Sequence, residues 1–246
     1  MFRPADYRAR SPRGPWTPVR ANRLRRMGLS VALEPGRTAC AASIEAFLRA
    51  VDAMSEHDLL HESRCHGWTR LDVVVHVISG WQEMLGGLVS RTDAEPSVDA
   101  ASYWPAFATE SAAEDPVAVL MSQRRRTAAY SRPAAATAHL GEVAAAVLRG
   151  IGSIEDRPHL WQGHVFAPGD YLAVWAVEDV VHHLDLMSDE PAPPSALRLT
   201  RATVEALVGE PLPASWSDLD ATLIGTGRVP VPDGSGPVSA RLPALG

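Results

Sequence analysis

A stretch of thirteen residues, 174–186, constrains this chain more than any other part of the sequence. It reads Val-Trp-Ala-Val-Glu-Asp-Val-Val-His-His-Leu-Asp-Leu, and its apolar pattern predicts a helix. Glu178 and His182 are four residues apart in it. On a helix they therefore lie on the same face, one turn apart. A carboxylate and an imidazole placed in this way can hold one divalent metal ion from one side.

A third metal ligand has to come from another part of the chain, because a catalytic zinc usually has three protein ligands and one open position. The best candidate is His76, which lies in a second apolar helix that begins after Thr69. Thr69 is a good N-cap residue, and Asp72 follows it at the spacing of a capping box. A single histidine on an apolar helix is more often a hydrogen-bonded core residue, so the pattern alone leaves both interpretations of His76 open.

Three other motifs have a plain structural interpretation beside the functional one. His61 and His66 resemble a zinc-protease motif but are five residues apart instead of four, which favours a polar loop. Residues 124–126 are three consecutive arginines, and we expect a solvated helix face there more than an anion site. The aromatic segment 103–107 either covers a pocket or forms a small hydrophobic cluster under a long loop.

The composition excludes several classes of protein. The net charge of the 246 residues is −6, which argues against nucleic acid as a partner because phosphate binding needs a basic face. Cys40 and Cys65 are the two cysteines, too few for a disulfide framework. Neither a membrane-spanning apolar run nor a signal peptide is recognisable. We therefore expect a cytoplasmic protein with no nucleic-acid or membrane partner, either a monomer or a homodimer.

We expect three regions along the chain: a flexible basic arm (1–30), a helical bundle (31–190) and a small α/β domain (191–246). The pattern within the bundle predicts helices over 37–54, from Thr69 onward, from Asp115-Pro116 to about 151 with a break at Pro133, and from an N-cap at Asp170 to 189–191. In the last region it predicts a helix over 197–208 and short strands at 221–225, 228–231 and 237–243.

Two segments of this chain resemble one known family. Residues 65–76, Cys-His-Gly-Trp-Thr-Arg-Leu-Asp-Val-Val-Val-His, and residues 178–186, Glu-Asp-Val-Val-His-His-Leu-Asp-Leu, are similar to motifs of the mycothiol-dependent maleylpyruvate isomerase family. That family belongs to the DinB-like metalloenzyme superfamily. Residues 223–230, Leu-Ile-Gly-Thr-Gly-Arg-Val-Pro, resemble the family's C-terminal domain. The three motifs occur in the family's order and together span most of the chain.

The resemblance implies a mainly α fold, namely a DinB-like four-helix bundle followed by a small α/β C-terminal domain. It implies a divalent metal, commonly zinc, held by His76, Glu178 and His182, and it implies mycothiol as the thiol cosubstrate. Family members isomerise maleylpyruvate or transfer the thiol to electrophiles. Val177 stands where many relatives have a basic residue, which speaks against a diacid substrate such as maleylpyruvate.

Four further residues complete the expected site. Arg228 matches an arginine that serves the substrate in some relatives, and the alternative is a structural role in the C-terminal domain. Asp185 is three residues after His182 and could orient its imidazole. Trp81 and Trp175 could form walls of the thiol-binding pocket, although aromatic residues at helical spacing are more often core. We expect His183 to be a packing or surface residue.

The ligand set points to an enzyme that activates a thiol. A bound metal ion favours the thiolate, which is the reactive nucleophile, and a thiolate added to a small electrophile gives either a conjugate or, after bond rotation and expulsion, a cis–trans isomer. Two alternatives remain open. One is a metal enzyme that uses another thiol or a metal-bound water as a hydrolase, and the other is a non-catalytic protein that binds a small molecule.

Overall fold

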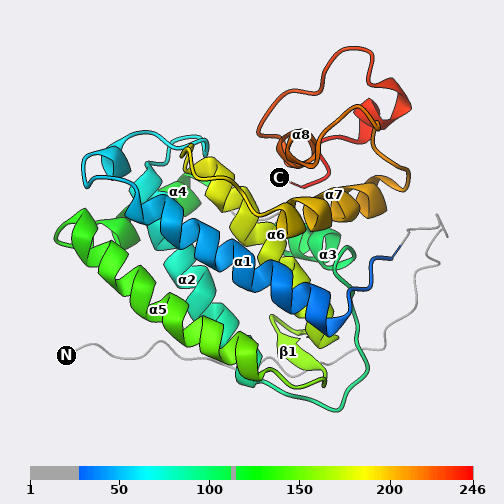
Figure 1. The fold of residues 1–246 in the computed structure, drawn as a ribbon, viewed down its shortest axis with the longest axis horizontal. Coiled ribbons are helices and arrows are strands. Elements are labelled where there is room, and N and C mark those ends of the chain that lie inside the picture. The colour runs from blue at the N-terminus through cyan, green and yellow to red at the C-terminus, as the bar shows by residue number, and fades with distance from the viewer. Residues whose placement is uncertain (1–27, 112–114, 246) are drawn as a thin grey trace.

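Four helices form the central bundle of the computed structural model, which describes residues 28–111 and 115–245. They are α1 (Leu33–Asp52), α2 (Arg70–Val89), α5 (Pro133–Ser153) and α6 (Pro168–Asp185). In Figure 1 the helices α1, α2, α5 and α6 run side by side, and α1 packs along α6 while α2 packs along α5. The mainly α fold is confirmed. The expected N-terminal arm lies almost wholly outside the described residues.

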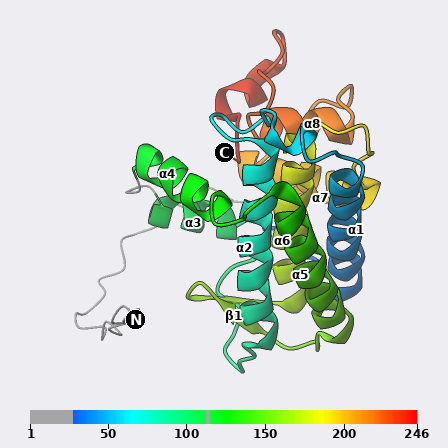
Figure 2. The same ribbon diagram turned by 90° about the vertical axis from the view of Figure 1, so that its left-hand side faces the viewer.

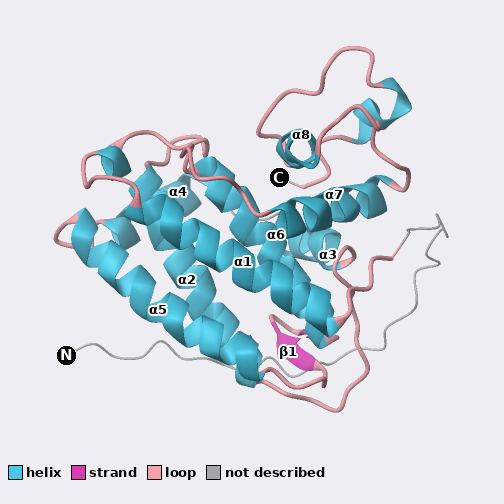
Figure 3. Ribbon diagram, in the orientation of Figure 1, coloured by secondary structure: helices cyan, strands magenta, loops and turns pink. Residues whose placement is uncertain are grey.

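Shorter elements surround the bundle. A 3-10 turn, η1 (Asp58–Leu60), precedes α2, and α3 (Tyr103–Ser111) and α4 (Pro116–Thr127) follow it. Figure 2 shows α3 and α4 on the outer side of α2. The chain between α5 and α6 forms an antiparallel hairpin of β1 (His159–Trp161) and β2 (His164–Phe166), with Leu160 opposite Val165. This hairpin is the only sheet within the described part of the chain, and Figure 3 shows it at one end of the bundle.

The bundle core explains why these segments are helical. Each of the four helices contributes an apolar stripe, and the largest fully buried side chains include Phe47, Trp81, Leu140 and Tyr171. Close packing also depends on a glycine: a Cβ on Gly87 would lie 2.2 Å from the Tyr171 hydroxyl oxygen. No helix in the described residues has both the length and the low polarity that a bilayer crossing requires.

Local signals placed several helix boundaries correctly. Thr69 and Asp72 form the predicted capping box of α2, Asp115 caps α4, and the break at Pro133 separates α4 from α5. The prediction for α6 was wrong at both ends. It begins at Pro168 after Ala167, because proline favours the first helical position, and it ends at Asp185.

Asp170, the expected N-cap of α6, has a different role. Its carboxylate accepts a hydrogen bond from the Val31 backbone N–H at 2.6 Å and so ties the start of α1 to α6. Burial raises the pKa of Asp170 to about 6.

The C-terminal part packs against the bundle through α7 (Pro194–Val208), which contacts both α1 and α6. The three predicted strands in this part are wrong. Residues 218–225 form the helix α8 (Asp218–Gly225), 228–231 are irregular, and a 3-10 helix, η2 (Gly236–Arg241), occupies most of the third segment. The β-branched residues suggested strands, but Ser217 and Asp220 form a capping box that starts α8.

Packing within the C-terminal part also favours helices. Val204 of α7 contacts Gly225 so closely that a Cβ there would lie 2.6 Å from a Val204 methyl carbon. Val177 of α6 belongs to the same hydrophobic cluster as Val204 and Val238. The C-terminal part therefore rests directly on the helix that carries Glu178 and His182.

Candidate metal centre

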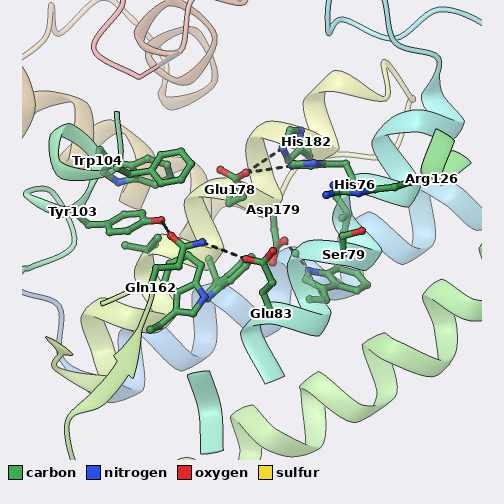
Figure 4. Close-up of a pocket in the computed structure, with 17 residues that line it drawn as sticks. His76, Ser79, Glu83, Tyr103, Trp104, Arg126, Gln162, Glu178, Asp179 and His182 are labelled. Carbon is green, nitrogen blue, oxygen red and sulfur yellow. Dashed lines mark hydrogen bonds and ion pairs between the residues drawn. The ribbon is translucent and has the colours of Figure 1, made fainter. Parts of the chain in front are cut away.

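Three of the predicted site residues lie close together between α2 and α6. His76 comes from the second turn of α2, and Glu178 and His182 come from one face of α6. His182 Nε2 is 3.2 Å from Glu178 Oε1, and His76 Nε2 is 3.6 Å from the same oxygen. One ligand atom from each residue lies within 4.8 Å of the other two. Figure 4 shows both imidazoles beside the Glu178 carboxylate. We call these three residues the triad.

The triad fits a divalent metal ion of the zinc type. Two ligands about 2.0–2.1 Å from a tetrahedral ion are roughly 3.3 Å from each other, and the two contacts of Glu178 Oε1 are close to that separation. Two imidazoles and one carboxylate are also a donor set that zinc and related ions accept. The side chains of His76 and Glu178 are 33% and 36% exposed, so the triad is open to a ligand from outside.

The charges of the triad are strongly coupled. Burial alone would raise the pKa of Glu178, but hydrogen bonds from His182 and His76 hold it well below its usual range. Burial would likewise lower the pKa of His182, yet contacts with Asp185, Cys65 and Glu178 raise it well above the usual value. Burial lowers the pKa of His76. The contact between His182 and Glu178 therefore acts in opposite directions on the two groups, raising the pKa of His182 and lowering that of Glu178.

Asp185 supports the triad from the far side of His182. Its Oδ2 lies 3.2 Å from His182 Nδ1, so Nε2 of the same ring is left to face Glu178. Asp185 is fully buried, and burial would raise its pKa, but contacts with His182 and Arg228 hold the pKa well below the usual range. Fixing one ring nitrogen in this way sets the tautomer and orientation of a ligand histidine.

The structure places Arg228 against Asp185. Arg228 Nε donates to Asp185 Oδ1 at 3.1 Å, Nη2 donates to Oδ2 at 2.9 Å, and Nη1 donates to the Thr226 carbonyl oxygen. The Cys65 thiol also contacts Asp185 Oδ2, at 3.1 Å. The guanidinium thus uses its paired N–H groups inside the protein, which favours the structural one of the two roles that the sequence left open.

A cavity of about 310 Å³ opens on one side of the triad, and we call it the aromatic cavity. Its walls combine the triad with polar residues and with aromatic side chains from α2, α3, β1 and α6: Trp81, Tyr103, Trp104, Phe107, Trp161 and Trp175. The segment 103–107 therefore covers a pocket instead of forming a separate cluster under a loop. Sequence spacing could not show this, because α3 is far from α6 along the chain.

Trp81 and Trp175 lie in the inner wall of this cavity and are both buried. Trp81 Nε1 donates to Asp179 Oδ1 at 2.8 Å. Burial raises the pKa of Asp179 to about 8, against the effect of this hydrogen bond. Trp175 packs at a tilt against Trp161, with 4.9 Å between the ring centres. Both tryptophans therefore shape the wall through packing, and Trp81 also fixes the residue beside Glu178.

A second cavity, of about 630 Å³, is also lined by the triad, and we call it the C-terminal cavity. It shares His76, Glu178, His182, Trp104 and Phe107 with the aromatic cavity. Its own lining comes from the loop before α2, from α6 and from the C-terminal part, including Cys65, Trp68, Val181, Arg228 and Leu245. The triad therefore lies where two cavities meet.

One histidine and three other residues complete the description of the site. His183 is buried and its Nε2 contacts the Glu190 carbonyl oxygen at 2.9 Å, as a packing residue would. Cys40 is a free, buried thiol. Arg126, which we expected on a solvated helix face, lines the aromatic cavity beside His76. Gln162, at the hairpin turn, also lines it.

Comparison with known proteins identifies one family model and two solved structures that this chain resembles. The sequence model described as "Mycothiol maleylpyruvate isomerase N-terminal domain" matches residues 40–187. Two solved structures of a mycothiol-dependent maleylpyruvate isomerase, one of them a single-residue variant, are 16% and 15% identical to this chain. They align with TM-scores of 0.51 and 0.50, over 71% of this chain and 70% of theirs. No curated protein sequence matches the chain.

Proposed function

The chain belongs to the mycothiol maleylpyruvate isomerase N-terminal domain family, a family of enzymes, and from this premise we propose that it is a divalent-metal-dependent enzyme that uses mycothiol. Its reaction is the addition of the thiol to a small electrophile, with either a conjugate or a cis–trans isomer as product. The observation that carries this proposal is the triad itself, because donors from two separate helices converge where two cavities meet.

His76, Glu178 and His182 would hold the metal ion. The ion, once bound, would favour the deprotonated form of a thiol at its open position. The protein supplies the rest of the chemistry. Asp185 keeps His182 Nδ1 occupied, and Arg228 keeps Asp185 ionised and in place. The two cavities give the thiol and the electrophile separate routes to the same three side chains.

The aromatic cavity suits the electrophile. Six aromatic side chains line it and can stack on a planar, unsaturated group. The larger C-terminal cavity, lined by the loop before α2, by α6 and by the C-terminal part, is the side from which we propose that the thiol approaches.

A thiol titration tests this proposal. Zinc-loaded protein is titrated with mycothiol in a weak buffer that contains a pH indicator, and consumption of monomethyl maleate is then followed in the ultraviolet. We expect one proton released per bound thiol and consumption that requires the thiol. Glu178→Gln keeps the shape of the side chain but removes the charge, and it should abolish both signals. Wild-type protein that neither binds the thiol nor releases a proton would contradict the proposal.

A further inference from the structure

Arg126 is held beside the triad by the way α4 is attached to α2. Gln123 Nε2 donates to the Asp72 carbonyl oxygen at 2.8 Å, and the Thr127 hydroxyl donates to Asp72 Oδ1 at 2.5 Å. Asp72 is buried in the first turn of α2, four residues before His76. The two anchors lie on either side of Arg126 in the sequence. They therefore bring that side chain to the level of His76, where Figure 4 shows it at the edge of the cavity.

The Arg126 guanidinium differs from the other arginines near the triad. Within residues 28–111 and 115–245 it has no salt bridge and no side-chain hydrogen bond in the structure. Arg228 is committed to Asp185 by two hydrogen bonds, and Arg124 donates to the Gly67 carbonyl oxygen. Burial is the largest cause of the lowered pKa of His76. The positive charges of His182 and Arg126 lower this pKa further, so the charge of Arg126 acts on the triad. Arg126 is thus a cation that lines the cavity and whose hydrogen-bond donors have no partner among the described residues.

The same cavity carries a negative charge farther along α2. Glu83 is seven residues after His76, so the two lie on the same face of α2 about 10 Å apart along its axis. Gln162 Nε2 donates to Glu83 Oε2 at 3.2 Å, and the Tyr103 hydroxyl donates to Gln162 Oε1 at 2.9 Å. These two hydrogen bonds hold the Glu83 carboxylate at the cavity wall, and neither Gln162 nor Tyr103 brings a positive charge to it.

The cavity is therefore lined by a cation beside His76 and by a carboxylate farther along α2, together with aromatic rings. A guanidinium binds a carboxylate with two parallel hydrogen bonds. A fixed carboxylate repels a second carboxylate that is placed near it. An elongated molecule with one carboxylate matches this arrangement, and a molecule with a carboxylate at each end does not.

We propose that Arg126 binds the single carboxylate of a monoanionic, unsaturated electrophile and that Glu83 disfavours electrophiles with a second carboxylate. This inference rests on the proposed function for the reaction that follows, but it concerns binding. It assigns substrate selection to two residues of the aromatic cavity, neither of which belongs to the triad.

The inference is tested by calorimetry, which measures the affinity of three small probes for the zinc-loaded protein in the absence of thiol. The probes are monomethyl maleate, maleate and dimethyl maleate, which carry one, two and no carboxylates on the same unsaturated frame. We expect the monoester to bind at least several-fold more tightly than either of the others. Equal affinity for maleate and its monoester, or no binding of any probe, would overturn the inference.

Variants assign the effect to the two residues. Arg126→Gln should weaken binding of the monoester by about 10- to 100-fold and leave the diester unchanged, and Arg126→Lys should restore part of the loss. Glu83→Gln should tighten binding of maleate several-fold. Arg125→Gln removes the neighbouring exposed guanidinium and is the matched control, with no expected effect. An unaltered monoester affinity in Arg126→Gln, the same loss in Arg125→Gln, or an unaltered maleate affinity in Glu83→Gln would overturn the assignment.

Two further measurements separate the possible failures. Thermal unfolding of each variant shows whether it is folded, which we expect because the anchors of α4 are Gln123 and Thr127. Proton release on thiol binding, measured on the same preparations without any probe, reports on the proposed function alone. Normal proton release with no charge preference among the probes overturns only the inference. A clear preference for the monoester without proton release overturns only the proposed function.

Discussion

The aromatic cavity and the C-terminal cavity share the triad but differ in whether their charged side chains are paired within the protein. In the C-terminal cavity the guanidinium of Arg228 is committed to the buried carboxylate of Asp185. In the aromatic cavity Arg126 and Glu83 are both exposed and face the space where a ligand would lie. The first arrangement is typical of a site held rigid for a metal ligand, and the second of a surface that selects a substrate. Changes in the two cavities should therefore have different consequences.

The largest expected effect comes from the residues that both cavities share. Glu178→Gln removes one donor of the triad and should lower turnover by about 1,000-fold or more, since a bound metal ion stabilises the transition state by several kcal/mol. Both thiol binding and turnover should fall together, which stopped-flow assays of each step would show. Normal thiol binding in this variant would mean that the cavities do not depend on a common centre.

Next in size are changes in the C-terminal cavity, where we expect a loss of stability. Asp185→Asn leaves Arg228 without its partner and should lower the free energy of unfolding by about 2–4 kcal/mol at pH 7. The pKa of Asp185 lies below its usual value, so its contribution is present above about pH 4 and is lost as the pH falls further. The difference in unfolding free energy between wild type and variant, followed by urea denaturation, should therefore shrink below pH 4.

The same variant should also weaken zinc binding by about 10- to 100-fold, since Asp185 orients His182. Arg228→Gln is its companion, and it should reproduce part of the loss of stability with a smaller effect on zinc affinity. If Asp185→Asn were as stable as the wild type at pH 7 and bound zinc equally well, the rigid role of this cavity would be wrong.

A change in the wall of the aromatic cavity should affect the electrophile with little effect on stability. A Cβ on Gly80 would lie 3.2 Å from a ring carbon of Trp175, so Gly80→Ala pushes that ring into the cavity. The gain of about 1 kcal/mol in helix propensity offsets most of an overpacking cost of similar size. We expect KM for the electrophile to rise several-fold, and the midpoint of thermal unfolding to change little. An equal rise in KM for the thiol would show that the two substrates do not approach through separate cavities.

The smallest expected effect concerns the hairpin turn. Gln162 has a φ of 48°, a left-handed conformation that asparagine adopts more readily than glutamine. Gln162→Asn relieves about 0.5–1 kcal/mol of backbone strain, but its shorter side chain also loses hydrogen bonds of similar worth to Tyr103 and Glu83. We therefore expect the free energy of unfolding to change by less than about 1 kcal/mol and electrophile binding to weaken slightly. Unaltered electrophile binding would show that the link from Tyr103 to Glu83 does not position that carboxylate.

Local sequence signals predicted the helices well and the site partly. The capping box at Thr69, the break at Pro133 and the four-residue spacing of Glu178 and His182 depend only on neighbouring residues, and the structure shows each of them as expected for a helix. The strands predicted near residue 223 were wrong because β-branched residues there pack against α7 as a helix. Tertiary packing decided that case, not local propensity.

The remaining parts of the site depend on distant contacts that no spacing reveals. Arg126 belongs to the aromatic cavity because Gln123 and Thr127 attach α4 to Asp72, 51 and 55 residues away in the chain. Arg228 meets Asp185 across 43 residues. The sequence indicated Arg228 as a site residue but did not show that it binds Asp185.

The most direct test of the metal centre is the zinc content of wild-type and His76→Ala protein after loading and exhaustive dialysis, measured by mass spectrometry. His76 is the one triad residue on α2, so its removal tests whether the two helices hold an ion together. His139→Ala is the matched control, because its ring contacts Tyr130 and Gln82 away from the triad. We predict about one equivalent of zinc in the wild type and in the control, and little in His76→Ala. Wild-type protein that retains no metal, or a His76→Ala variant that retains as much as the wild type, would contradict the assignment of the triad.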